Sequence, residues 1–552
     1  MTGSIPFFSA CNREADRKPL NIIHIMSDDH SFQTIGAYGH PLSKLAPTPN
    51  IDRLAAEGVL FRRAFVENSL STPSRACLMT GLYSHQNGQR QLGKGIDTTK
   101  TFISELLQAQ GYRTAVVGKW HMQCEPKGFD YYHIVNGQGD YYNPAFKSKT
   151  SNGKYVREEG YATQLITDHA IEFLENRDTN KPFALFVHHK APHRNWMPEG
   201  KYLDLYEETE FPYPETFYDD YSSRCDAAAS QEMTIAKDMT MITDLKVAEW
   251  EAGISEINWD DSVAVWTESG LKDGRIRERI ARQLTPEQRE SREWEQALDR
   301  LTPEQRKAWD DGYSEKNKAF IAQNLKGEDL VKWKYQRYIK DYLRCIRTVD
   351  DEVGRLMKYL EEHDLLENTV IVYTSDQGFY MGEHGWFDKR FMYEESLRTP
   401  LIVRYPGDNA ARGITSDALV QNIDYAATYL DVAGTGKTAG MIGLSLLPLL
   451  DDGLAPDDWR EDLYYHYYDY PAVHQVRRHD GVRNDRYKLI HFYGKGEGKD
   501  AGNDIDCNEL YDLQNDPNEL NNVYGHADYK DVREHLQKRL DKYRADLKVD
   551  EY

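Results

Sequence analysis

The sequence has few cysteines, and none of them stand at a metal-binding spacing. Its 552 residues include six cysteines, and no two form a C-x-x-C pattern. This disfavours zinc ribbons and thioredoxin-like redox centres, which need that spacing. Disulfides remain possible, but the sequence does not assign their pairing. The six are Cys11, Cys77, Cys124, Cys225, Cys345 and Cys507.

Long apolar runs and excess positive charge are also missing. No stretch of about 18 apolar residues occurs, which is the length needed to cross a bilayer, so we expect no transmembrane helix. Lys and Arg total 68 against 90 Asp and Glu, for a net charge of −22. Nucleic-acid binders carry basic patches, so this balance argues against nucleic acid as a partner.

The first residues suggest export. Phe7 to Cys11 reads Phe-Phe-Ser-Ala-Cys, which resembles the end of a bacterial lipoprotein signal with Cys11 as the lipidated residue, although the charged segment that opens such signals is missing. We expect residues 1–19 to be an export remnant or a disordered segment. We also expect the protein to reach the bacterial periplasm or cell envelope, with a possible lipid anchor at Cys11.

Four short apolar runs each end in polar, chemically capable side chains. Continuous apolar runs of this length indicate strands buried on both faces of a parallel sheet. Ligands of such sheets bind beyond the carboxyl ends of the strands, so the four ends are expected to line one site. The predicted fold class is α/β, a large mixed, mostly parallel sheet flanked by helices. The runs are 22–26, 114–117, 183–187 and 370–373.

Other segments define the predicted domain organisation. Residues 20–439 are expected to form the main domain, with apolar positions at helical spacing across 335–360. Residues 225–330 are charged and strand-poor, and we interpret them as a helical insertion. Leu-Thr-Pro-Glu-Gln-Arg occurs there twice, at 284–289 and 301–306, and each copy matches a helix capping box. Residues 440–552, with a strand pattern at 487–492 and a charged terminal helix, predict a smaller α+β subdomain.

Acidic side chains follow two of the apolar runs. Asp28 and Asp29 come after the first run, and Asp376 and Gln377 come after the fourth. Carboxylate and amide oxygens are hard donors, which suit Ca²⁺ or Mg²⁺ better than zinc. The Asp pair alone would more readily be a loop or helix cap. Together with Asp376 and Ser71, these residues favour a divalent-cation site over that alternative.

The most informative motif is Ser71–Gly81, which reads STPSRACLMTG. Pro73 suits the first turn of a helix, which would place Ser71 at the positive end of that helix, where anions bind. Arg75 adds a fixed positive charge within reach. The plainer alternative is a Ser cap before a core helix. The residue types and their spacing resemble the activation signature of the type I sulfatases, in which Cys or Ser at the first position is oxidised to formylglycine.

That resemblance implies a fold, a cofactor and a partner. The fold would be alkaline-phosphatase-like. Formylglycine would form at position 71 by the action of a formylglycine-generating maturation enzyme. One cation, usually Ca²⁺, would bind against it, with Asp28, Asp29, Asp376, Gln377 and the side chain derived from Ser71 as its ligands. The sequence does not show whether Ser71 is native or replaces a cysteine.

The resemblance also implies a sulfate clamp. Lys119 and His121 lie in Gly-Lys-Trp-His, His193 follows Ala-Pro, and Lys389 follows Trp-Phe-Asp. Lys119, His193 and Lys389 would stabilise charge on the sulfuryl oxygens, and Arg75 would help to activate the nucleophile. His193 would protonate the leaving alcohol, a task that Lys389 could share, and His121 would act as the base that expels sulfate. Each residue taken alone could equally be a surface or core side chain.

One segment bears on the substrate. Residues 388–394 (DKRFMYE) resemble the corresponding region of N-acetylglucosamine-6-sulfatases, although residues 381–386 also resemble iduronate-2-sulfatase and choline-sulfatase. We expect an exo-acting enzyme for the 6-O-sulfate of N-acetylglucosamine in heparan- or heparin-type glycosaminoglycan fragments. The negative charge argues against a broad basic groove for long polymers. Asp388, Arg390 and His479 are the expected sugar contacts, and structural ion pairing is the alternative for all three.

The sequence leaves three other functions open. The substrate could be another sulfated sugar, such as a 2-O-sulfated uronate or the 6-sulfated N-acetylglucosamine of mucin or keratan. The protein could be a phosphodiesterase of the alkaline phosphatase superfamily, which would normally hold two zinc ions. It could also be a silent sulfoglycan-binding protein in which Ser71 is never oxidised.

Overall fold

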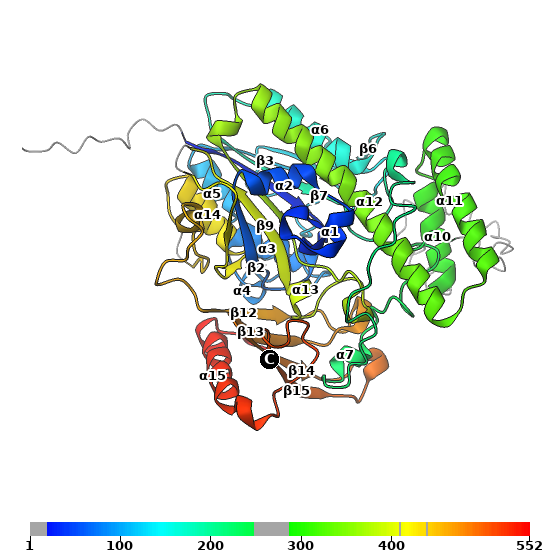
Figure 1. The fold of residues 1–552 in the computed structure, drawn as a ribbon. Coiled ribbons are helices and arrows are strands. Elements are labelled where there is room, and N and C mark those ends of the chain that lie inside the picture. Colours follow the sequence, from blue (N-terminus) through cyan, green and yellow to red (C-terminus); the bar gives the residue numbers. More distant parts are fainter. Residues whose placement is uncertain (1–18, 248–285, 408–409, 438–439) are drawn as a thin grey trace, which may run out of the picture.

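A large sheet between two layers of helices forms the body of the molecule, and a smaller sheet lies beside one end of it (Figure 1). The computed structural model describes residues 19–247, 286–407, 410–437 and 440–552. The expected export segment, including Cys11, lies outside the described residues.

The large sheet has eleven strands in the order β10-β2-β9-β8-β1-β7-β3-β4-β5-β6, with β11 beside β2. Its central strands β8, β1, β7 and β3 are mutually parallel, and they contain the four predicted apolar runs. The prediction of a mixed, mostly parallel sheet is confirmed. The strands are β1 (Asn21–Ser27), β2 (Val59–Phe65), β3 (Arg113–Gly118), β4 (Tyr131–Val135), β5 (Ala145–Ser148), β6 (Val156–Arg157), β7 (Phe183–His189), β8 (Thr369–Ser375), β9 (Arg398–Arg404), β10 (Ile414–Ser416) and β11 (Val420–Gln421).

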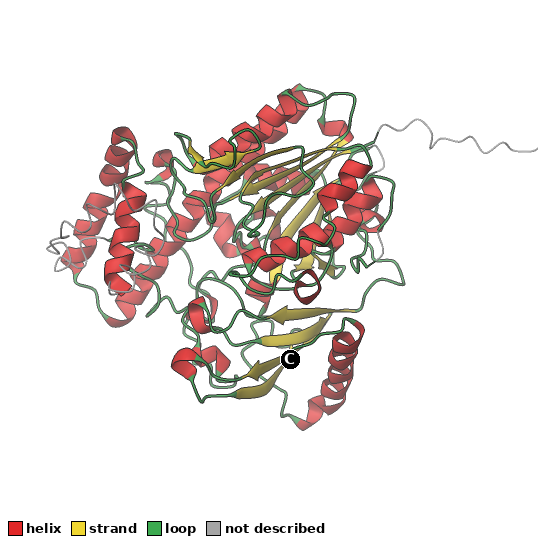
Figure 2. Ribbon diagram, turned by 180° about the vertical axis from the view of Figure 1, so that it is seen from behind, coloured by secondary structure: helices red, strands yellow, loops and turns green. Residues whose placement is uncertain are grey.

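Helices bury both faces of this sheet, as a parallel centre requires (Figure 2). Successive strand residues alternate between the two cores: Ile23 and Ile25 pack into one, and Ile22 and Met26 into the other. One layer is built mainly from α1 (Pro41–Leu45), α2 (Pro49–Ala56), α6 (Ala162–Glu175) and α12 (Gly327–Glu362). The other is built mainly from α3 (Ser71–Thr80), α5 (Ile103–Ala109) and α14 (Asp424–Val432).

The helical spacing predicted across 335–360 is the carboxyl part of the long helix α12. Before it stand α7 (Ala227–Ser230), α10 (Pro286–Leu298) and α11 (Pro303–Gln323). Residues 286–323 of the 225–330 segment are therefore mostly helical, whereas residues 231–247 form turns and irregular chain. The second capping box is confirmed: Thr302 Oγ1 accepts from Gln305 N at 3.3 Å, and Gln305 Oε1 accepts from Thr302 N at 2.9 Å. The start of the first copy at 284–285 lies outside the described residues.

The smaller sheet contains the carboxyl-terminal strands. Its order is β12-β13-β14-β15, all antiparallel, with α15 (Lys530–Asp546) packed against it. The strand predicted at 487–492 and the charged terminal helix are both present. The strands are β12 (Asp462–Tyr467), β13 (His479–Asn484), β14 (Tyr487–Gly494) and β15 (Ile505–Asp512); the remaining α-helices of the described chain are α4 (Ser84–Asn87) and α13 (Glu394–Leu397).

One disulfide links the segment before α7 to the smaller sheet. Cys225 is bonded to Cys507 on β15, a pairing that the sequence could not assign. Cys77, Cys124 and Cys345 are free thiols. No helix within the described ranges combines the length and apolar content needed to cross a membrane.

Candidate active site

Polar side chains from the ends of the central parallel strands converge on one place. Asp28 and Asp29 follow β1, Asp376 follows β8, and Lys119 follows β3. His193 lies four residues beyond β7, within 3.9 Å of Asp29. The residues that follow β1, β3 and β8 are almost completely buried, with relative exposures of 0–1% for Asp28, Asp29, Lys119 and Asp376. The expectation that the strand ends share one site agrees with this arrangement.

Helix α3 brings the sulfatase-like motif to the same place. Ser71 is its first residue, and Gly81 ends it with a φ of 64°. The Ser71 hydroxyl donates a hydrogen bond to Asp28 Oδ1 at 3.2 Å. One turn later, Arg75 Nε and Nη2 donate to Asp376 Oδ2 at 3.1 and 3.0 Å, and Nη1 donates to the carbonyl of Lys119 at 2.7 Å. Arg75 therefore ties the helix to the ends of β8 and β3.

Lysines neutralise the buried carboxylates. Lys389 Nζ lies 2.5 and 2.7 Å from the two carboxylate oxygens of Asp29. Lys119 Nζ donates to Asp28. The backbone N–H of Asp29 donates to Asp376 Oδ1 at 3.1 Å, so the acidic residues of the two strands are in direct contact. Buried charges are tolerated only when paired in this way.

The pKa shifts reflect this crowding. Burial raises the pKa of Asp29 to about 7, with Lys389 opposing the shift and the neighbouring acids adding to it. Burial also raises the pKa of Asp376 to about 6, and the charge of Asp28 adds to the effect. Burial alone would likewise raise the pKa of Asp28, but the Lys119 ammonium and other nearby cations hold it well below its usual range. The raised pKa values of Asp29 and Asp376 show how burial and mutual repulsion act on acids that lie this close together.

The donor set fits a hard divalent cation. Gln377 Nε2 donates to Asp376 Oδ1 at 2.8 Å, and its carbonyl oxygen Oε1 is buried without a hydrogen-bond partner among the described residues. Asp28, Asp29 and His193 each offer an atom, and these atoms lie within 4.8 Å of one another. Carboxylate and amide oxygens are the ligands that Ca²⁺ and Mg²⁺ prefer. Asp28, Asp29, Asp376 and Gln377 would hold such an ion, with the position 71 side chain beside it.

Two histidines border the cluster. His121 Nδ1 lies 3.2 Å from Thr72 Oγ1, and burial lowers the pKa of His121 to about 3. His193 Nδ1 contacts the carbonyl of Arg194, which leaves Nε2 facing Asp29. Burial, with Lys119 nearby, holds the pKa of His193 well below its usual range. Burial thus favours the neutral form of both rings.

The pKa values of Lys119 and Lys389 are shifted in opposite directions. Burial lowers the pKa of Lys119 to about 8, against the attraction of Asp28. The pKa of Lys389 is raised, because the charge of Asp29 and other acids outweighs the opposing effect of burial. The positively charged form is therefore more strongly favoured for Lys389 than for Lys119.

Backbone conformations of high energy gather at these residues. Asp29, His121, Asp388, Arg390 and His474 all have positive φ, at 67°, 52°, 75°, 100° and 71°. Side chains other than glycine rarely adopt such angles, and the strain persists only where the surrounding structure enforces it. Such clustering is typical of functional sites.

The expected sugar contacts lie beside Lys389, together with a residue that the sequence interpretation missed. His474 Nε2 is 3.2 Å from Asp388 Oδ2, and Arg390 Nη2 is 3.6 Å from Asp388 Oδ1. Arg390 Nε and Nη1 are buried without hydrogen-bond partners in the described chain, so this guanidinium has donors to offer to a ligand. No local motif marks His474, and only the return of the chain after β12 brings it to Asp388.

His479 lies elsewhere. It is the first residue of β13 and is fully buried, with its ring centroid 5.4–5.7 Å from those of Phe391, Tyr465 and Tyr467. An enclosed ring in an aromatic core has no face left for a sugar. The structure gives no support to a sugar contact by His479, whereas His474 lies beside Asp388.

We expect His474→Ala and Arg390→Ala each to raise KM for the substrate by about 10-fold, the effect of losing one ligand hydrogen bond of roughly 1.5 kcal/mol. Steady-state kinetics on the purified variants measure this. His479→Phe keeps an aromatic ring in the stack and serves as the comparison. A larger rise in KM for His479→Phe than for His474→Ala would reverse the assignment.

Two cavities are lined by histidines of the cluster. One of about 300 Å³ is lined by His193, Lys190, Arg194 and, from the helical segment, Trp294 and Arg300. Another of about 470 Å³ is lined by His121 and residues of β4 and β5. Both histidines of the cluster are therefore accessible to a small ligand.

Comparison with known proteins decides the family. The Sulfatase family model matches residues 20–435, three quarters of the chain. The chain belongs to the sulfatase family. The helix that begins at Ser71 presents the motif that resembles the activation signature of this family. The carboxyl-terminal part, residues 382–546, also matches the family model described as N-sulphoglucosamine sulphohydrolase, C-terminal.

Individual relatives and solved structures show how far the similarity extends. This sulfatase is 43% identical over 540 residues to an N-acetylglucosamine-6-O-sulfatase of Bacteroides thetaiotaomicron, covering 97% of this chain and 88% of the relative. It is 25% identical to human N-acetylglucosamine-6-sulfatase over 82% of this chain and 67% of the human protein. It superposes with a TM-score of 0.84 and 43% identity on a solved structure in complex with its substrate D-glucosamine-2-N,6-O-disulfate, covering 97% of this chain and 99% of the other.

The fold itself is shared more widely. A phosphonate monoester hydrolase from Silicibacter pomeroyi superposes with a TM-score of 0.62 at 18% identity, covering 95% of each chain. The sheet therefore does not separate sulfatases from other hydrolases of this architecture, and the site residues must do so.

Proposed function

We propose that this sulfatase hydrolyses the 6-O-sulfate ester of N-acetylglucosamine at the end of heparan- or heparin-type fragments, with formylglycine at position 71 and one Ca²⁺. The observation that carries the proposal is the contact between Ser71 and Asp28 at the N-terminus of α3, inside a cluster of buried acids and lysines. The similarity to a named N-acetylglucosamine-6-O-sulfatase over nearly the whole chain supports the choice of sugar.

The chain's own residues bind and orient the sulfate. When present, formylglycine at position 71 supplies the nucleophilic oxygen and the cation supplies charge that polarises the ester. Arg75 fixes the helix end against Asp376, and Lys119 and Lys389 provide ammonium groups within the same buried cluster. Charges preorganised in a site without water stabilise the developing negative charge more than solvent would.

The directions of the pKa shifts bear on the proposed proton transfers. His121 is neutral, so it can accept a proton as the base that expels sulfate. His193 is also neutral before substrate binds, while Lys389 is protonated. Lys389 and His193 are the two proposed donors to the leaving alcohol, and the raised pKa of Lys389 favours Lys389. This shifts the weight of the expected assignment toward Lys389.

The alternatives are weaker on chemistry. A two-zinc phosphodiesterase would need more His ligands than the described residues supply, since His193 alone is grouped with Asp28 and Asp29 there. A silent binding protein would not need the complete set of Arg75, Lys119 and Lys389 around position 71.

We further infer export to the periplasm or cell envelope, which the Cys225–Cys507 disulfide supports because such bonds persist in oxidising compartments.

The test is a panel of sulfated monosaccharides incubated with protein from a host that performs the maturation. We expect sulfate release from 6-O-sulfated N-acetylglucosamine and none from the 3-O-sulfated sugar or a 2-O-sulfated uronate. Mass spectrometry of the peptide containing position 71 should show the loss of two hydrogens that converts the alcohol to the aldehyde. Release from the uronate alone would overturn the substrate, and an unoxidised Ser71 in active protein would overturn the mechanism.

A further inference from the structure

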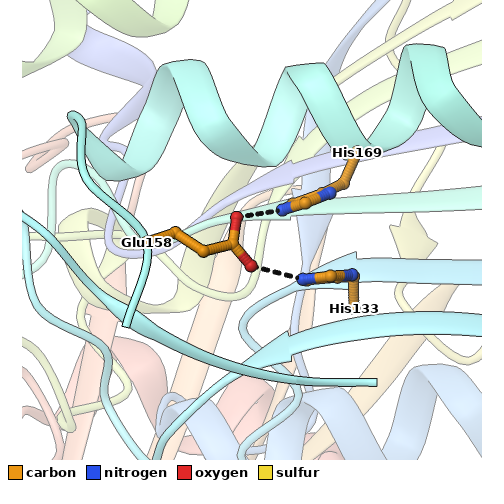
Figure 3. Close-up of side chains that lie close together, drawn as sticks. All are labelled: His133, Glu158 and His169. Atoms are coloured by element: carbon orange, nitrogen blue, oxygen red, sulfur yellow. Dashed lines mark hydrogen bonds and ion pairs between the residues drawn. The ribbon is translucent and has the colours of Figure 1, made fainter. Parts of the chain in front are cut away.

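A second cluster of metal-ligand side chains lies away from the active site. His133 comes from β4, Glu158 follows β6 directly, and His169 comes from α6 (Figure 3). His133 Nε2 lies 2.7 Å from Glu158 Oε1, and His169 Nε2 lies 2.8 Å from Glu158 Oε2. Both imidazoles thus direct the same nitrogen toward one carboxylate, although the three residues come from separate elements.

The geometry brings the three donors within reach of one ion. One ligand atom from each residue lies within 4.8 Å of the others. The two rings stack with their centroids 3.5 Å apart and 15° between their planes. The relative exposures of the side chains are 18% for His133, 28% for Glu158 and 12% for His169. The cluster is therefore open to an ion from solvent. A small tilt of the rings and a withdrawal of Glu158 would open the central position.

The surroundings resemble the outer shell of a metal site. His169 Nδ1 is 3.1 Å from Glu172 Oε2, and the Tyr131 hydroxyl donates to the same oxygen at 3.1 Å. Metal-binding histidines typically give their second ring N–H to a carboxylate, which fixes the ring and leaves the other nitrogen for the metal. Glu172 holds His169 in this orientation.

We propose that His133, Glu158 and His169 bind a divalent transition-metal ion of the Zn²⁺ class. Two imidazole nitrogens and one carboxylate oxygen are a borderline donor set that suits Zn²⁺, whereas the all-oxygen set of the active site suits Ca²⁺. Three protein ligands leave a fourth position for water. Zn²⁺ binds neutral imidazole, so binding displaces the protons that the rings now share with Glu158.

Such an ion would fasten the edge of the large sheet. His133 pairs in register with Val117 of β3, two residues before Lys119. The ion would join β4, the chain after β6 and α6 into one unit beside the strand that carries Lys119. It would thus act as a structural support for the active-site edge and take no part in the reaction.

The experiment is a Zn²⁺ titration of the untagged protein in buffer with excess Ca²⁺, which occupies the active-site acids. We expect one equivalent of bound Zn²⁺ per chain, and a rise in melting temperature at saturation. His133→Gln and His169→Gln should each lose that equivalent, while Glu172→Gln should weaken binding about 10- to 100-fold. With Co²⁺ in place of Zn²⁺, visible absorption of a four-coordinate ion should appear in the wild type only.

The matched control is His535→Gln, which removes an exposed histidine on α15 and should keep the equivalent. Circular dichroism shows whether each variant is folded. The proposal is overturned if the wild type binds no Zn²⁺ in the presence of Ca²⁺, or if folded His133→Gln and His169→Gln both retain the full equivalent. In that event the three residues form only a hydrogen-bonded link between the strand and the helix.

Discussion

Replacing Ser71 with alanine is expected to abolish sulfate release, with kcat falling on the order of 10⁴-fold or more, as removal of a catalytic nucleophile generally does. Ser71 is the side chain that begins α3 and contacts Asp28. Alanine fits the helix start and removes only the oxygen that maturation would oxidise. The fold should therefore remain, and the free energy of unfolding should change by no more than about 1 kcal/mol, the net contribution of one hydrogen bond. Sulfate release from 6-O-sulfated N-acetylglucosamine is the measurement.

The matched comparison is Ser71→Cys, the other residue that the family signature accepts. It should be active when produced in a host whose maturation enzyme oxidises cysteine, and inactive without that enzyme. Both variants should bind the sulfated sugar, because the lysines and Arg390 are unchanged. Activity of Ser71→Ala within tenfold of the wild type would show that position 71 is not the nucleophile.

Asp376→Asn is expected to remove the response of the protein to Ca²⁺. Asp376 is fully buried, accepts from Arg75 and touches the backbone of Asp29, so it stands at the centre of the proposed cation site. A cation that binds only the folded state stabilises it by about 2.7 kcal/mol at 100 times its Kd. The wild type should gain several degrees in melting temperature when Ca²⁺ is restored after chelation, and the variant should gain almost none. The rate should also fall about 10²- to 10³-fold, in the range seen when one preorganised electrostatic partner is lost.

The amide introduced by Asp376→Asn keeps the shape of the carboxylate and one oxygen for Arg75, so the change isolates charge from packing. Asp458→Asn, at an exposed position, controls for the loss of one negative charge and should respond to Ca²⁺ as the wild type does. Equal stabilisation of Asp376→Asn and the wild type by Ca²⁺ would show that the ion binds elsewhere.

The central strands were predictable because their signal is local. A run such as 183–187 is apolar at every position, and only a strand covered on both faces needs that pattern. The end of each such run then carries the functional residues, since parallel strands present their carboxyl ends on one edge. The structure accordingly brings Asp28, Lys119 and Asp376 together, as expected from their places after the runs.

The helix that begins at Ser71 was also predictable, because the residues that start and end it lie within one stretch of eleven residues. Gly81 takes the left-handed conformation that ends a helix, and Arg75 falls one turn after Ser71, on the side that faces Asp376. The 3.6-residue period of a helix is enough to place these two side chains on one face.

Sequence alone therefore determined the class of fold, the four strand ends and the helix at position 71, all of which follow from patterns spanning a few residues. Only the tertiary structure decided that His474 and not His479 meets Asp388, that Cys225 pairs with Cys507, and that His133 and His169 share Glu158. Each of these depends on where distant segments cross. That choice is made by packing and strand register over the whole chain, and no short window of residues encodes it.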